Sequence, residues 1–145
     1  MPTMKDATET PRLARNAMGA AVIAVLGLAS VIVPAISEPH WMPSPLFPLL
    51  RTAIERFSWV PIASLAALGF VAGYFTRLPR LVIAGASVAI LPLATIAEIA
   101  VDPSSHNLFP FEFVMYGLMA LPVLGAAWIG RKIRASKSES PSIER

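Results

Sequence analysis

The sequence predicts an all-α membrane protein in which four transmembrane helices form an antiparallel bundle, with the N and C termini both cytoplasmic. Of its 145 residues, 55% are hydrophobic and only 14% are charged, whereas a soluble domain has about 25% charged residues. Apolar runs of about 20 residues, the length that a helix needs to cross a bilayer, occur four times. The remaining segments are too short to bury a core of their own, so one bundle accounts for residues 17–130.

The residue composition excludes several classes of protein. The chain has no cysteine, so it forms neither a disulfide nor a zinc–thiolate site, and no thiol pair carries electrons through it. Its net charge of +3 arises from basic residues that flank the apolar runs and make no face suited to nucleic acid. A b-type haem requires axial ligands inside the bundle, but both histidines fall in predicted loops. We therefore expect contact with the lipid bilayer, and neither a cofactor nor nucleic acid.

The N-terminal part of the chain contains the first predicted span. Residues 1–16 mix prolines and charged residues without apolar periodicity, which predicts a disordered basic tail. The first span, about 17–37, belongs to an uncharged run that is longer than the roughly 7–15 apolar residues of a cleaved signal peptide, so we expect it to be retained. Four prolines then exclude a continuous helix over 38–57, although a short amphipathic helix fits 49–57.

Three further spans follow. The second, about 57–76, is bracketed by arginines and has aromatic residues near its ends. Aromatic residues are enriched where helices meet the membrane surface. The third, about 81–101, stops where Asp102 precedes a proline. The fourth, about 110–130, is followed by residues 131–145, which we expect to be a disordered basic tail.

Prolines and small residues mark how these spans should pack. Pro92 and Pro122 lie in the middle of the third and fourth spans, and each is expected to bend its helix. Pairs of small residues four positions apart let another helix approach closely. The pairs are Gly69 with Gly73 and Gly85 with Ala89. We expect them to pack against helices of the same bundle, with a dimer face as the alternative.

The distribution of basic residues predicts the orientation. Ten of the 12 Lys and Arg residues lie in the two tails and in the loop between the second and third spans. Because cytoplasmic segments carry the excess of Lys and Arg, both tails should be cytoplasmic. The expected location is a cell membrane, specifically the bacterial inner membrane, with several passes.

A polar turn between the third and fourth spans holds the candidate site. Helical spacing gives the third span one small-and-polar stripe, in which Glu98 lies about 25 Å from the start of the span. The stripe consists of Ala84, Ser87, Leu91, Ala94, Thr95, Glu98 and Asp102. Glu112 reaches a similar depth from the fourth span. Two buried carboxyl groups so placed cannot both stay charged, so they would share a proton or bind a cation. The candidate proton- or cation-binding residues are Glu98, Glu112, Asp102, His106, Tyr116 and His40.

Each candidate also has a structural explanation. Glu112 falls in the first turn of its helix, where a carboxylate is stabilised by the helix dipole. Asp102 and His106 would be well solvated in a turn. Glu98 is the strongest functional candidate, because an ionisable group inside a span is expensive. No tight metal-binding repeat is present, so a proton is favoured over a metal ion, whose identity the sequence leaves open.

The sequence supports three functions, in decreasing order. The first is a non-enzymatic accessory, assembly or scaffold subunit, which binds a larger membrane complex or a second copy. The second is a small proton- or cation-coupled transporter in which Glu98 titrates. The third is an interfacial enzyme acting on lipid or quinone. Because phosphate-loop, serine-hydrolase and zinc-protease motifs are absent from the sequence, we expect no catalytic residues.

Overall fold

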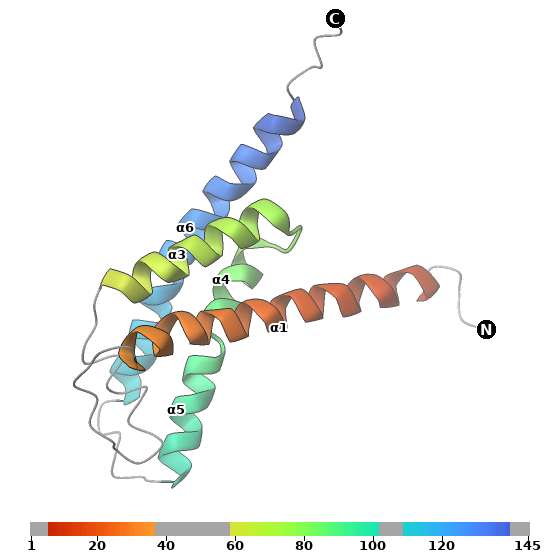
Figure 1. Ribbon diagram of the computed structural model, residues 1–145. Coiled ribbons are helices and arrows are strands. Elements are labelled where there is room, and N and C mark those ends of the chain that lie inside the picture. Colours follow the sequence, from red (N-terminus) through yellow and green to blue (C-terminus); the bar gives the residue numbers. More distant parts are fainter. Residues whose placement is uncertain (1–5, 37–58, 102–108, 140–145) are drawn as a thin grey trace, which may run out of the picture.

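The computed structural model describes residues 6–36, 59–101 and 109–139, and these form helices apart from the turn at 76–79 and a single residue, Ala89. The helices are α1 (Asp6–Ile36), α3 (Trp59–Phe75), α4 (Arg80–Val88), α5 (Ile90–Val101) and α6 (Phe109–Glu139) (Figure 1). Among these described residues, three stretches are long and apolar enough to cross a membrane, namely Pro11–Pro34, Arg80–Ala97 and Pro110–Ser138. Helix α3 is apolar but shorter, with 17 residues. The all-helical, membrane-type character is therefore confirmed for the described residues.

The first and last helices extend beyond the predicted spans. Each has 31 residues, which corresponds to about 46 Å. Residues 6–16 and 131–139 are helical, although the sequence analysis places both in disordered tails. Extending an existing helix requires no new nucleus, and both stretches contain the strong helix formers Ala, Arg and Glu.

The third predicted span consists of two helices. Helix α4 ends at Val88, and Ala89 separates it from α5. Pro92 has no N–H to donate to the carbonyl of Val88, and the Ala89 N–H instead donates to the carbonyl of Ala86 at 3.2 Å. The expected bend therefore takes the form of an interruption one turn before the proline. Pro122, in contrast, lies within the single continuous helix α6.

Helices α3 and α6 pack with their backbones in contact and run in the same direction (Figure 1). A Cβ atom on Gly69 would lie 2.5 Å from the carbonyl oxygen of Val123, and one on Gly73 would overlap the carbonyl oxygen of Ala127. Gly130 of α6 likewise meets the carbonyl oxygen of Phe70. Glycine at these three positions lets the helices approach to backbone contact, as in small-residue packing between membrane helices.

A second close contact joins α1 to α4. Gly27 of α1 faces the backbone of Ser87, and a Cβ atom there would overlap the Ser87 carbonyl oxygen. Leu65, Ile83, Leu91 and Val123 are among the fully buried side chains of the core that these contacts enclose. Large apolar side chains are nonetheless exposed on every helix, which is the pattern expected when lipid and not water surrounds them.

The small-residue pair Gly85 and Ala89 does not pack against another described helix in the way that Gly69 and Gly73 do. Gly85 is exposed, with nothing within 4 Å of the place where its Cβ would lie, and Ala89 is exposed as well. The packing expected at these two positions is therefore not found within the described part of the chain. The reason is the rotation of α4 about its own axis, which turns Ile83, Ala84 and Ser87 toward the core.

Candidate functional site

A buried hydrogen bond links helix α5 to helix α6. The Thr95 Oγ1 and Tyr116 OH atoms are 2.6 Å apart, and either atom may be the donor. Thr95 is 0% exposed and Tyr116 is 3% exposed. A hydroxyl buried in apolar surroundings is costly unless it has a partner, so this bond satisfies both groups. It also fixes the register of α5 against α6.

That register places two further positions near each other along the helices. Helices α5 and α6 run in opposite directions (Figure 1). Position 98 lies three residues after Thr95, and Glu112 lies four residues before Tyr116. Because the helices are antiparallel, both positions are about one turn from the Thr95–Tyr116 bond, toward the C-terminal end of α5 and the N-terminal end of α6. Glu112 is half-buried in the first turn of α6, where the amide dipoles favour its carboxylate.

The remaining candidates cannot be placed. Asp102, His106 and His40 lie outside the described residues, and so does the side chain of Glu98. Among the residues that are described, no group of three or more His, Asp or Glu side chains could hold a metal ion. The structure therefore describes Tyr116 and Glu112 one turn apart on α6 and leaves the proposed carboxylate site untested.

The polar stripe of the third span is directed inward. Ser87 is 1% exposed and donates its hydroxyl to the Ala84 carbonyl at 2.8 Å. Leu91 and Thr95 continue the same buried side, and Ala94 is half-buried beside them. Since both buried hydroxyls already have partners within the chain, this stripe stabilises packing and offers no open polar surface along its described length.

Arg134 makes a contact that sequence reasoning missed. Its Nη1 atom donates to the Tyr74 carbonyl at 3.1 Å and to the Thr76 carbonyl at 2.5 Å. These carbonyls belong to the C-terminal end of α3, where helix carbonyls lack partners inside the helix and a cation is favoured by the dipole. Lys137 adds a cation–π contact, with its Nζ atom 5.8 Å from the centre of the Tyr74 ring. The basic end of α6 thus caps α3.

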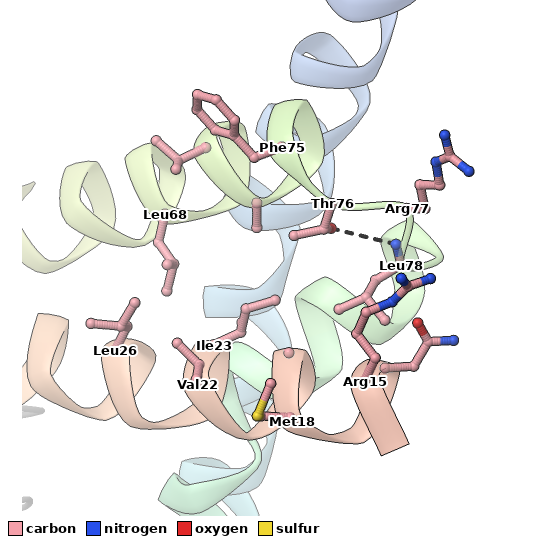
Figure 2. Close-up of a pocket in the computed structure, with 14 residues that line it drawn as sticks. Arg15, Met18, Val22, Ile23, Leu26, Leu68, Phe75, Thr76, Arg77 and Leu78 are labelled. Carbon is pink, nitrogen blue, oxygen red and sulfur yellow. Dashed lines mark hydrogen bonds between the residues drawn. The ribbon is translucent and has the colours of Figure 1, made fainter. Parts of the chain in front are cut away.

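A groove separates α1 from α3 at the end of the molecule where this cap lies (Figure 2). Its volume is about 690 Å³, which is within the range of roughly 300–1,000 Å³ for ligand sites. Most of its walls are apolar, and its lining includes Arg15, Asn16, Thr76 and Arg77. Composition gave no indication of this groove, because residues far apart in the sequence form it.

The comparisons with protein families, with curated proteins and with solved structures find no match to this chain. The function must therefore be argued from the contacts described above.

Proposed function

We propose that this chain is an integral membrane protein with four spans and with both termini in the cytoplasm of a bacterial cell, in the inner membrane. The three long apolar stretches support three of the spans. Helix α3 supports the fourth, because 17 residues extend about 26 Å, close to the roughly 30 Å of a hydrocarbon core.

The placement of the basic residues supports this orientation. Arg15 of α1 and Arg77 of the turn after α3 line the same groove, and Arg134 of α6 binds the carbonyl of Thr76. Segments that are far apart in the sequence therefore bring their cations to one end of the helices. An excess of Lys and Arg at one end is typical of the cytoplasmic side.

Cysteine labelling tests the orientation directly, because the natural chain has no cysteine. We expect S105C to react with a membrane-impermeant maleimide in intact spheroplasts. S136C, on the exposed end of α6, should react only after lysis. Labelling of S136C in intact spheroplasts, or protection of S105C there, would contradict the proposed orientation.

Within the membrane, we propose that the protein acts as a non-enzymatic accessory subunit that binds a partner through its lipid-facing surface. The close packing of the interior supports this function. Helices approach each other to backbone contact at Gly27, Gly69 and Gly73, and the hydroxyls of Ser87, Thr95 and Tyr116 are hydrogen-bonded within the chain. A subunit with so closely packed an interior is suited to rigid side-by-side binding.

The observation that carries this proposal is a set of glycines without contacts. Gly85, Gly117 and Gly125 lie in helices, and nothing is within 4 Å of the place where a Cβ atom would sit on any of them. Glycine costs a helix about 1 kcal/mol relative to alanine. Packing inside the described chain does not explain this cost, whereas close approach of a helix from another subunit does.

Native extraction in mild detergent, followed by mass analysis, tests the accessory function. We expect the tagged wild type to recover a partner at fixed stoichiometry, either a larger complex or a second copy. G125L should lower the recovered partner at least about tenfold, since a large side chain blocks close helix approach. A67L is the matched control, because Ala67 is exposed on α3 outside this set. A lone wild-type species, or equal loss with A67L, would contradict the proposal.

A small proton-coupled carrier is the second candidate, and the register set by Thr95 and Tyr116 favours it. Support comes from the spacing: position 98 is three residues after Thr95 and Glu112 is four residues before Tyr116, so the two positions fall at a similar level along antiparallel helices. In proteoliposomes with an imposed membrane potential, a pH-sensitive dye inside the vesicles should report proton entry that E98Q abolishes. E139Q, at the far end of α6, should leave the flux unchanged. Absence of wild-type flux, or flux that persists in E98Q, would contradict the carrier.

A further inference from the structure

The groove between α1 and α3 has apolar walls along most of its length. Met18, Val22 and Leu26 follow each other at four-residue intervals along one side of α1, and Val71 and Phe75 of α3 also line the groove. All five are exposed, from 47% at Leu26 to 75% at Phe75. The more deeply buried lining residues are Ile23, Ala72 and Leu78. Such a surface matches a hydrocarbon chain.

One end of the groove is cationic. Arg15 of α1 and Arg77 of the turn are both at this end, as Figure 2 shows. None of the described residues that line the groove is acidic. Within the same described part of the chain, neither guanidinium is engaged by a hydrogen bond or an ion pair. Two arginines in this position match an anionic phosphate, which arginine binds through paired N–H donors.

The length of the groove matches one leaflet. Leu26 is eleven positions after Arg15, which corresponds to about 16 Å along α1. Half of a hydrocarbon core is about 15 Å. With the arginines at the level of the headgroups, the apolar part of the groove would therefore extend to the middle of the bilayer.

We propose that this groove binds one anionic glycerophospholipid. The phosphate is held between Arg15 and Arg77, and an acyl chain lies along α1 and α3 on the apolar lining. Charge complementarity and leaflet length select this occupant over a helix of another protein, which has no counterpart to the cationic end. The site is independent of the partner proposed above, since the glycines without contacts lie on α4 and α6.

Native mass spectrometry of the purified full-length protein, titrated with phosphatidylglycerol or phosphatidylcholine, tests the proposal. We expect one phosphatidylglycerol to bind at least about tenfold more tightly than phosphatidylcholine, because each basic residue near an anionic headgroup adds measurably to binding. R15Q/R77Q should remove this preference. The matched control is R12Q/R80Q, which makes the same change in net charge at exposed arginines that do not line the groove.

A second pair of variants tests the apolar part. V22W places a large side chain in the groove and should lower phosphatidylglycerol binding about tenfold. V25W adds the same side chain on α1 at an exposed residue outside the groove and should leave binding unchanged. Equal binding of the two lipids, or equal loss with R12Q/R80Q, would overturn the proposal. So would a dimer without bound lipid that V22W disrupts, since a second copy would then occupy the groove.

Discussion

Replacing Gly73 with alanine is expected to destabilise the protein by about 3 kcal/mol, the upper end of the usual cost of overpacking. The added methyl group would overlap the carbonyl oxygen of Ala127. Backbone atoms cannot move aside as a flexible side chain can, so α3 and α6 would have to separate. Their contact is the most extensive between any two described helices. Thermal or denaturant unfolding in detergent micelles measures the effect.

Gly85 provides the matched control for this prediction. It lies in another helix of the same protein, and open space surrounds the position of its Cβ. We expect G85A to leave stability unchanged or to raise it by up to about 1 kcal/mol, because alanine favours a helix over glycine by that amount. If G73A and G85A had the same effect, backbone contact would not be the reason for glycine at position 73.

Replacing Arg134 with alanine is expected to lower the free energy of unfolding by about 2 kcal/mol. The substitution removes two charge-assisted hydrogen bonds, to the carbonyls of Tyr74 and Thr76, and a hydrogen bond to a charged group contributes roughly 1.5–3 kcal/mol. Arg134 is half-buried, so water should replace part of this contribution. Unfolding in detergent measures the total, and hydrogen exchange at the end of α3 should show local fraying.

Two neighbouring variants separate this cap from general loss of charge. K137A removes a cation that lies over the Tyr74 ring and should cost only about 0.5–1 kcal/mol. R134K keeps the charge but loses the planar donor group that reaches both carbonyls, so it should restore only part of the stability. A loss of the same size in R134A and K137A would show that the carbonyl contacts contribute nothing beyond charge.

How much of the fold could be predicted differs from element to element. Runs of apolar residues predicted helices in the regions of α1, α3 and α6, because hydropathy and helix length depend only on local sequence. Helix ends were predicted less well. Helix α1 begins at Asp6 and α6 continues to Glu139, since an existing helix extends through polar residues at little cost. A bend was predicted at both Pro92 and Pro122; near Pro92 the helix is interrupted at Ala89, whereas α6 continues through Pro122.

The candidate site was predictable only in part. Helical spacing correctly turned Thr95 inward, but its bond to Tyr116 depends on the register between two helices. The carboxylate arrangement around Glu98 stays a prediction, since that side chain, Asp102, His106 and His40 lie outside the described residues. The sequence predicted Arg134 only as one of the basic residues that follow the last span. Its hydrogen bonds to the Tyr74 and Thr76 carbonyls depend on how α3 packs against α6.

The sequence alone therefore predicted apolar helices long enough to cross a membrane, because the transfer of apolar side chains from water to lipid depends on composition and length. Tertiary structure decided which of two similar small-residue pairs packs, with Gly69 and Gly73 against α6 and Gly85 and Ala89 outward. It also brought Arg15 and Arg77 to the same end of one groove. Both results depend on the rotation and crossing of helices, which van der Waals packing fixes only after the segments meet.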